Sequence, residues 1–412
     1  MTLIRPFTGL RPIAGRAADV VAPPYDVLSS AEALERAAGK PWSFLHISKP
    51  EIDLEPGVDP YDERVYARGA ANLRAMIEAG VLMRDPVPCY YVYRLIMGDH
   101  TQTGLVAEAS VAEYDAGRIR RHEFTRPDKE EDRVRQIDAL NAQTGPVFVT
   151  YRHDDVVDAM ITEICNAEPA YDVTADDGVR HILWVESDPT RTAALTAVFE
   201  RMDRLYIADG HHRSAAASRV ATMRRAANPG HTGEESYNYF QTVIFPDNQM
   251  KILDYNRVVA DLGGHTPAQF LDAVAQRFTV ESENHAVRPD QHGEFGMYVA
   301  QQWYRLHLKS DLMPEDPVGR LDVSLLQDNL IAPVLGIEDP RRDKRIDFVG
   351  GIRGLDELER RVDSGDMSVA FALRPTGLDA LMAVADAGEV MPPKSTWFEP
   401  KLADGLVSHV LD

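Results

Sequence analysis

The residue types best suited to chemistry lie in the segment YIADGHHRSAAA, residues 206–217. Its first three residues close an apolar run that predicts the end of a buried strand, and Asp209-Gly210 is a turn signal. From Ser214 the chain is rich in alanine, which favours a helix. We therefore expect residues 209–213 to connect a strand to a helix N-terminus, where backbone N–H groups and the helix dipole attract an anion.

The side chains of this junction suit a phosphate. Gly210 lets the backbone approach a ligand closely, and Arg213 can hold a phosphate through two hydrogen bonds. His211 and His212 add two imidazoles, and Asp209 can hold Mg²⁺ or orient a histidine. The alternative is a polar turn with a capping aspartate and two exposed histidines. The spacing alone does not separate a phosphate site from a metal site.

A second group of ionisable residues lies in RRHEFTRPDKEEDRVRQ, residues 120–136. A run of this kind is usually the solvated face of a helix. However, His122-Glu123 stands close in sequence to Lys129 and Arg133, so groups of both signs are packed together. The competing interpretation is that the run forms one wall of the same site.

Two proline-bounded segments offer further candidates. VVAPPYDVL, residues 20–28, presents Tyr25 and Asp26 on a stiff backbone, although it can also be only a rigid turn. MPPKSTWFEPKLADGL, residues 391–406, brings Lys394 and other polar and basic groups to an acidic chain. That segment can equally be packed against the core.

Composition restricts the class of protein. The chain has 412 residues, enough for two or three domains, with 44% hydrophobic and 26% charged residues. The net charge of −21 disfavours nucleic acid as a partner. Its two cysteines cannot build a disulfide framework or a cysteine-based zinc site. We find neither a signal peptide nor a membrane-spanning stretch, so we expect a cytoplasmic protein that is not bound to a membrane.

The order of elements predicts a mixed α/β (α+β) fold. Strands over 146–151, 181–186 and 205–208 alternate with helices near 154–166 and 191–202. NYFQTVIFPDNQMKILDYNRVV, residues 238–259, is expected to form a hairpin that turns at Asp247-Asn248. We divide the chain into an N-terminal α/β segment (1–113), a central core (114–250) and a C-terminal α/β segment (251–412).

Together, APPYDV, RRHEFT, IADGHHRSAAA and PPKSTWFEPKL resemble the bacterial and archaeal family catalogued as domain of unknown function 1015. The resemblance extends over nearly the whole chain. More distantly, the HE pair followed by DGHHR and an alanine-rich helix is similar to the ParB/sulfiredoxin-like superfamily, which includes free serine kinases. That resemblance implies a ParB/sulfiredoxin-like core in which DGHHR binds nucleotide phosphates, with Glu123 as base toward a serine hydroxyl.

The leading hypothesis is phosphoryl transfer between a nucleotide (ATP or ADP, with Mg²⁺) and a small hydroxylated metabolite such as free serine. Gly210, His211, His212 and Arg213 would bind phosphate, Glu123 would be the base with His122 beside it, and Asp209 would hold Mg²⁺. The candidates for substrate binding are Lys129, Arg133, Lys394, Tyr25 and Asp26.

Three alternatives remain open. The same groups can run the reaction in reverse, from phosphoserine or a similar compound. A metal-dependent hydrolase or phosphatase would use His122, His211, His212 and Asp209, although no familiar ligand spacing supports it. A non-catalytic regulator would bind nucleotide without turnover, and a homodimer is compatible with each of these functions.

Overall fold

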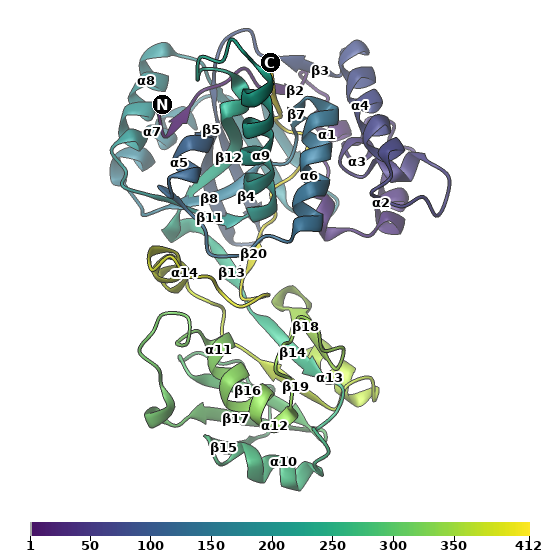
Figure 1. Cartoon of the computed structure of the whole chain (residues 1–412), viewed down its shortest axis with the longest axis vertical. Coiled ribbons are helices and arrows are strands. Elements are labelled where there is room, and N and C mark those ends of the chain that lie inside the picture. Colours follow the sequence, from purple (N-terminus) through teal and green to yellow (C-terminus); the bar gives the residue numbers. More distant parts are fainter. Residues whose placement is uncertain (1) are drawn as a thin grey trace. The chain divides into compact units, whose positions relative to one another are not determined.

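The computed structural model describes residues 2–412, which form two compact units. The first unit contains the chain up to Met250 together with Pro400–Asp412, and the second contains Lys251–Glu399 (Figure 1). The boundary expected between residues 113 and 114 falls inside the first unit. Residues 400–412, expected with the C-terminal segment, also belong to the first unit.

A nine-stranded mixed sheet forms the centre of the first unit. Its strands, in spatial order, are β6 (Ile119–Arg120), β11 (Leu205–Asp209), β8 (Val147–Tyr151), β12 (Tyr239–Pro246), β5 (His100–Ser110), β4 (Tyr90–Met97), β10 (Arg180–Glu186) and β9 (Tyr171–Thr174), with β1 (Ile4–Arg5) paired to β5. β12 runs parallel to β8 and β11 parallel to β6, whereas the other pairs are antiparallel. The prediction of a mixed α/β fold is confirmed.

The helices of the first unit begin where the sequence supplies caps. They are α1 (Ala17–Val20), α2 (Ser30–Ala37), α3 (Leu45–Ser48), α4 (Glu63–Glu78), α5 (Val111–Asp115), α6 (Pro127–Leu140), α7 (Asp155–Ile164), α8 (Pro189–Glu200) and α9 (His211–Ala227). Ser29 and Glu32 form the capping box of α2, and Asp154 and Asp188 cap α7 and α8. Short pairs β2 (Leu10–Pro12) with β3 (Leu82–Arg84), and β7 (Ala142–Gln143) with β21 (His409–Val410), complete the unit.

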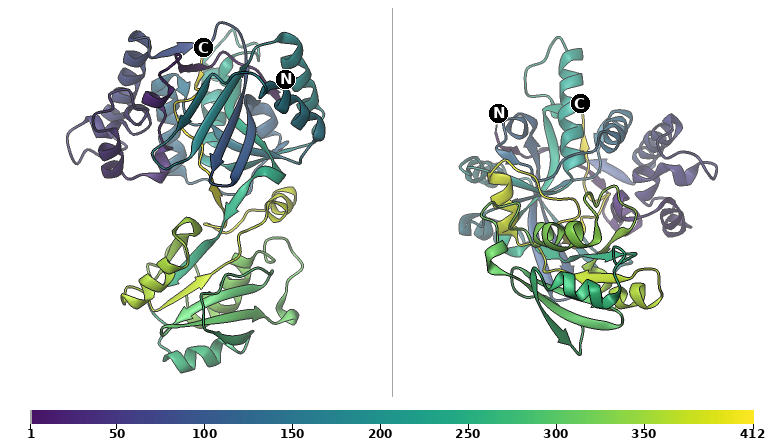
Figure 2. Two further views of the ribbon diagram at one scale, coloured as in Figure 1. Left: turned by 180° about the vertical axis from the view of Figure 1, so that it is seen from behind. Right: turned by 60° about the horizontal axis from the view of Figure 1, so that its bottom comes forward.

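Helices α6 and α9 lie side by side over one face of the sheet; they stand in front of it in Figure 1, and the strands face the viewer in Figure 2, left. Arg219 of α9 pairs with Glu130 and Glu131 of α6. Alanines of α9 are buried against the strands, so the helix packs closely on the sheet. This packing fixes the position at which α9 begins.

The second unit has a six-stranded antiparallel sheet. The sheet order is β15 (Phe278–Glu283), β17 (Gln302–Leu308), β16 (Glu294–Val299), β19 (Val369–Ala372), β14 (Tyr255–Val259) and β18 (Ile346–Gly350). Its helices are α10 (Pro267–Val274), α11 (Asp322–Leu326) continued to α12 (Ala332–Leu335), α13 (Asp356–Asp363) and α14 (Leu378–Asp386). Among residues 2–412, no helix combines the length and apolar character needed to cross a membrane.

Helix α9 begins at His211, within the strand-to-helix junction expected over residues 209–213, because the left-handed Gly210 already turns the chain into the helix. One local prediction is wrong. Residues 238–259 do not form a hairpin. β12 pairs with β5 and β8 of the first unit, β13 (Lys251–Leu253) pairs with β20 (Trp397–Glu399), and β14 pairs with β18 and β19.

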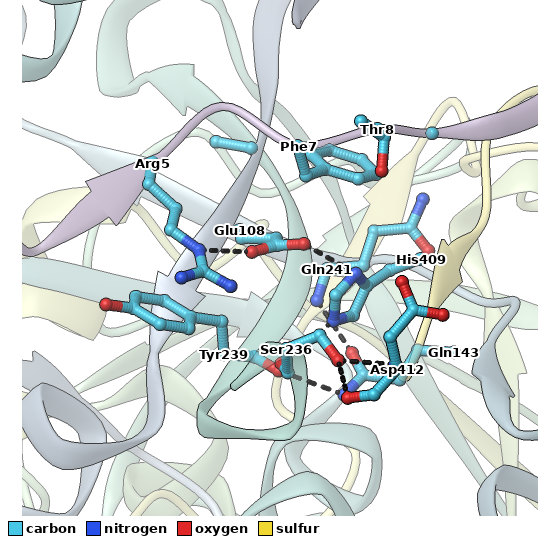
Figure 3. A network of polar contacts seen from close by, with 12 residues as sticks. Arg5, Phe7, Thr8, Glu108, Gln143, Ser236, Tyr239, Gln241, His409 and Asp412 are labelled. Atoms are coloured by element: carbon cyan, nitrogen blue, oxygen red, sulfur yellow. Dashed lines mark hydrogen bonds and ion pairs between the residues drawn. The ribbon is translucent and has the colours of Figure 1, made fainter. Parts of the chain in front are cut away.

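The C-terminal residues return to the first unit and are anchored there by a buried ion cluster. Glu108 of β5 lies between Arg5 of β1, at 2.6 Å, and His409 of β21, also at 2.6 Å (Figure 3). Burial acts to raise the pKa of Glu108, but His409 and Arg5 outweigh it and lower that pKa. The other imidazole nitrogen of His409 faces the carbonyl oxygen of Ser236 at 3.1 Å. One carboxylate thus joins the first and last strands of the chain to the central sheet.

Close packing of the returning segment predicts a marked effect of Gly405→Ala. Gly405 has φ +89°, and an added Cβ would lie 2.8 Å from Cγ of the buried Phe44. We expect a loss of about 1–2 kcal/mol in unfolding free energy from the left-handed backbone and about 1–3 kcal/mol more from the clash, measured by urea denaturation.

The matched control is Gly178→Ala, which has φ +82° and no neighbour within 4 Å of the added Cβ. It should show the backbone cost alone. Equal losses for the two variants would contradict the packing described around Phe44.

Candidate functional site

The junction between β11 and α9 is shaped by a bulge and a glycine. The register of β11 against β8 shifts between Ile207 and Asp209, immediately before the turn. Gly210 then adopts φ +100° and caps α9 without a side-chain hydrogen bond. A bulge re-aims the residues that follow it, and a left-handed conformation at this point favours glycine. The first turn of the 17-residue α9 therefore begins directly at the end of the strand.

The two motif histidines hold the loop that carries the HE pair, 89 residues earlier in the sequence. The backbone N–H of His122 donates to Nε2 of His211 at 3.4 Å. The backbone N–H of Arg126 donates to Nε2 of His212 at 3.0 Å. The structure thus brings together His122, Glu123, His211 and His212, which sequence analysis had selected from two separate motifs.

These hydrogen bonds determine the form of both imidazoles. Because Nε2 accepts in each ring, neutral His211 and His212 carry their proton on Nδ1. Burial lowers the pKa of His211 well below its usual value, with His122 as the next cause. Burial, followed by Arg126, also lowers the pKa of His212. The histidines are therefore neutral rings that organise the loop by accepting its backbone N–H groups at Nε2.

The Glu123 carboxylate lies beside His211. Its Oε2 is 3.6 Å from Nδ1 of His211, and 47% of the Glu123 side chain is exposed while His211 is buried. The proton on Nδ1 consequently faces an accessible carboxylate. This arrangement orients a group that can accept a proton from a ligand.

His122 lies behind this pair. Its ring is perpendicular to that of His211, with centroids 4.4 Å apart. Its Nδ1 has no hydrogen-bond partner among the described residues, and the side chain is buried. Burial lowers the pKa of His122 to about 4. The ring therefore supports His211 in a neutral form.

Asp209 faces cations. Its carboxylate lies 3.2 Å from Nζ of Lys401 and 3.8 Å from the guanidinium of Arg213. Burial would raise the pKa of Asp209, but Lys401 and Arg213 outweigh it and hold that pKa well below the usual range. Two cations already occupy the positions around the carboxylate, so it does not fit the expected role of magnesium ligand. The described residues, 2–412, also hold no group of three or more His, Cys, Asp or Glu side chains suited to a metal.

Arg213 is largely enclosed, with 12% of its side chain exposed. One terminal nitrogen donates to the carbonyl oxygen of Pro146 at 2.5 Å. Burial acts to lower the pKa of Arg213, but Asp209 and Asp26 outweigh it and raise that pKa. The guanidinium of Arg213 therefore contacts Pro146 and Asp209 on the side of α9 away from the histidine loop. Binding a phosphate through two hydrogen bonds would compete with these contacts.

Arg133 and Tyr25 lie on that same side. The guanidinium of Arg133 lies 3.9 Å from the centroid of the Tyr25 ring and 2.6 Å from Asp132. Burial raises the pKa of Tyr25 to about 12, so its hydroxyl remains protonated. Asp132 also accepts a hydrogen bond from Tyr66 at 2.8 Å. These contacts hold Arg133 beside the pocket that Arg213 also lines.

The remaining predicted residues have other neighbours. Lys129 donates to the hydroxyl of Tyr61 at 2.5 Å. Asp26 is exposed in the short helix η1 (Tyr25–Val27), and its negative charge helps to raise the pKa of Arg213. Lys394 belongs to the second unit, where its ammonium lies over the ring of Tyr255 at 5.5 Å. Substrate-binding roles for these three residues stay predictions.

Sequence analysis missed one residue of the cluster and undervalued another. Asp404 is buried and lines the pocket with Arg213, and Lys401 contacts Asp209. The available signal was the Asp-Gly step at Asp404-Gly405, which repeats the turn pair of the DGHHR motif close after a lysine. Nothing in the local sequence indicated that it returns to the first unit.

The geometry predicts unusual histidine tautomers. Long-range nitrogen–proton NMR spectra should show His211 and His212 neutral with the proton on Nδ1 near pH 6.5, because backbone N–H groups occupy both Nε2 atoms. The exposed His285 provides an internal reference for a solvated ring. An Nε2–H form at either motif histidine would contradict the hydrogen bonds described.

Acid should destabilise the protein through His122. The pKa of His122 is lowered from 6.5 to about 4 in the folded protein. Between these two pH values, His122 is therefore protonated in the unfolded chain and neutral in the folded protein. The free energy of unfolding should therefore fall as pH falls across this window. In His122→Gln, the free energy of unfolding should depend less on pH across this window. An unchanged dependence would contradict the lowered pKa assigned to His122.

Comparisons with known proteins place the chain among relatives of low identity. No curated protein matches it. Among solved structures, it is similar to a free serine kinase in complex with AMP at 12% identity and a TM-score of 0.34, covering 74% of this chain and 92% of that one. It is also similar to SbnI with C-terminal truncation from Staphylococcus aureus, at 13% identity and a TM-score of 0.38, covering 72% and 84%.

A conserved hypothetical protein from Pyrococcus furiosus is similar at 14% identity and a TM-score of 0.33, covering 73% of this chain and 94% of that one. A family model matches residues 4–324, most of the chain and all of the motif residues around α9. The chain therefore belongs to the family described as protein of unknown function (DUF1015).

Proposed function

We propose that this protein transfers a phosphoryl group between a nucleotide and a small hydroxylated metabolite at the start of α9. The observation that carries the proposal is the accessible Glu123 carboxylate, oriented by the Nδ1 proton of His211 beside a helix start capped by left-handed Gly210. A proton acceptor next to an anion-attracting helix terminus is the combination that phosphoryl transfer to a hydroxyl requires.

The nucleotide phosphates would bind at the first turn of α9. Its N–H groups point away from the helix and carry the positive end of the dipole. Gly210 permits close approach of a phosphate to the backbone. Lys401, which pairs with Asp209, adds positive charge at the same junction. This binding mode does not require Arg213 to leave its contact with Pro146.

Glu123 would act as the base. Its carboxylate takes the proton of the substrate hydroxyl while the hydroxyl oxygen forms a bond to the terminal phosphorus and the bond to the nucleotide diphosphate breaks. The products are the phosphorylated metabolite, the shortened nucleotide and a protonated Glu123, which releases its proton to solvent. His211 serves as a positioning residue, because its Nδ1 proton fixes the orientation of the carboxylate.

The same groups serve the reverse transfer, from a phosphorylated metabolite to a nucleotide diphosphate. Protonated Glu123 then returns its proton to the leaving oxygen, as microscopic reversibility requires. Free serine in the forward direction and phosphoserine in the reverse direction are the first substrates to assay. A protein that binds nucleotide but turns over neither would be the non-catalytic regulator.

Substitution of Gly210 tests the phosphate site. In Gly210→Ala, a Cβ would lie 3.0 Å from Nε of Arg213 at φ +100°, which should displace the backbone of the first turn. We expect ATP and ADP to bind at least about tenfold more weakly, a change of about 1.4 kcal/mol, measured by isothermal titration with MgCl₂ present. Gly233→Ala, with φ +98° and no neighbour within 4 Å of the added Cβ, should bind like the wild type. Equal affinity of both variants would reject a phosphate site at α9.

Substitution of Glu123 tests the base. Glu123→Gln should lower turnover by about 10²–10⁴-fold, the usual contribution of a general base, while nucleotide affinity stays within about twofold. Phosphorus NMR follows both directions of transfer. The control is Glu168→Gln, because Glu168 is an exposed glutamate of the first unit that lies outside α6 and α9. Loss of nucleotide binding by a folded Glu123→Gln protein would argue against the assigned role.

A further inference from the structure

A small pocket lies on the side of α9 that faces away from the histidine loop. Arg133, Arg213, Asp404, Ser48 and Tyr25 are among its lining residues. Its volume is about 30 Å³, which holds about two water molecules or a group of similar size. All of its lining residues belong to the first unit.

Two buried oxygen atoms of this lining have no hydrogen-bond partner among the described residues. They are Oγ of Ser48 and Oδ1 of Asp404, and the Asp404 side chain is almost completely buried. Buried polar atoms normally have partners, and leaving them without one costs free energy. The pocket is therefore built for an occupant that forms hydrogen bonds.

Guanidinium groups determine the charge of that occupant. Arg133 and Arg213 both line the pocket, and each guanidinium has five N–H donors, more than its contacts with Asp132 or with Pro146 use, so each can also donate to a carboxylate. Each also has a carboxylate neighbour outside this role, Asp132 for Arg133 and Asp209 for Arg213. A pocket for about two waters suits the two oxygens of a carboxylate better than the four of a phosphate.

The pocket and Glu123 lie on different sides of one helix turn. His211 and Arg213 are two residues apart in α9, so their directions differ by about 200° around the axis. His211 contacts Glu123, and Arg213 lines the pocket. A substrate that joined the two would lie across the N-terminal end of α9, at Gly210.

We infer that this pocket binds the carboxylate of the hydroxylated substrate, through Arg133 and Arg213, with Asp404 donating a hydrogen bond from its protonated form. The substrate class is thus a small hydroxy acid or hydroxylated amino acid. The assignment of the pocket to the substrate rests on the proposed function, but carboxylate binding itself can be measured without catalysis.

The surroundings of Asp404 support a protonated donor. Burial raises the pKa of Asp404 to about 8, against the opposing effects of Arg213 and Arg133. Exposed Asp26 adds to this rise, a backbone hydrogen bond with Tyr25 opposes it, and the Tyr93 phenol is a further titratable group close to Asp404. An entering carboxylate would raise the pKa further, because like charges disfavour each other. Binding near pH 8 should therefore take up part of a proton.

Gly145→Ala is a suitable steric test. An added Cβ would lie 3.5 Å from both Cδ of Arg213 and Oδ1 of Asp404, an ordinary contact distance that places a methyl group between them. The variant should fold normally. Gly230→Ala is the control, since its Cβ would meet only Asn228, also at 3.5 Å.

The experiment is isothermal titration of the Glu123→Gln protein with glycerate, L-serine and 1,2-propanediol, without nucleotide so that no transfer can occur. We expect both carboxylates to bind and the diol, which has no carboxylate, to bind at least tenfold more weakly. Adding Gly145→Ala should weaken glycerate at least tenfold, whereas Gly230→Ala should change nothing. Titration in buffers of different ionisation enthalpy should show proton uptake at pH 8, little at pH 6, and none in Asp404→Asn.

Each outcome separates this inference from the proposed function. Equal binding of the diol, or glycerate binding indifferent to Gly145→Ala, would overturn the inference even if wild-type protein transfers phosphate. Carboxylate binding that depends on Gly145 and takes up a proton through Asp404 would support it even if no transfer is found. Binding of none of the probes to folded protein would leave a water-filled pocket and also overturn it.

Discussion

The buried Glu108 carboxylate is the interaction on which the arrangement of the first unit depends. It pairs with Arg5 in the first strand and with His409 in the last, at 2.6 Å each. A buried carboxylate without a partner would be costly, so removing either partner would leave an uncompensated charge inside the sheet. The pairing therefore favours only those structures in which both ends of the chain are docked on β5. Lys401 and Asp404 reach α9 because the segment that carries them is fixed in this way.

The charge at the start of α9 depends on which side chains are buried there as well as on the composition of the chain. The chain has a net charge of −21, yet the start of α9 collects Arg213 and Lys401 around Asp209, and Arg133 beside Asp132. The histidines add no positive charge, because burial and accepted hydrogen bonds keep them neutral. An anion would thus meet backbone dipoles and a few fixed cations in a protein whose average surface repels it.

Much of this site could be predicted from local sequence, because the strand, the turn and the helix of DGHHR are adjacent in the chain. The closeness of His122-Glu123 to His211 was only a hypothesis, since no local pattern encodes a contact over 89 residues. Asp404 was missed for the same reason, because its place beside Arg213 depends on the return of residues 400–412 to the first unit. The wrong prediction of a hairpin over 238–259 has a related cause. Alternating apolar residues predict strands but do not identify the strands with which they pair, and β12 pairs with β5 and β8.

The first turn of α9 separates two kinds of chemistry that the sequence places next to each other. His211 and Arg213 point to different sides of the helix because consecutive residues are rotated by about 100°. On one side a neutral imidazole orients an accessible carboxylate, and on the other a guanidinium lines a small pocket. Between them lies the helix axis, where the dipole potential is most favourable for negative charge. Under the proposed function, a substrate held at one side and activated at the other would bring its reacting oxygen near that axis, where a transferring phosphoryl group would be best stabilised. The order of residues in DGHHR thus follows from the geometry of a single helical turn.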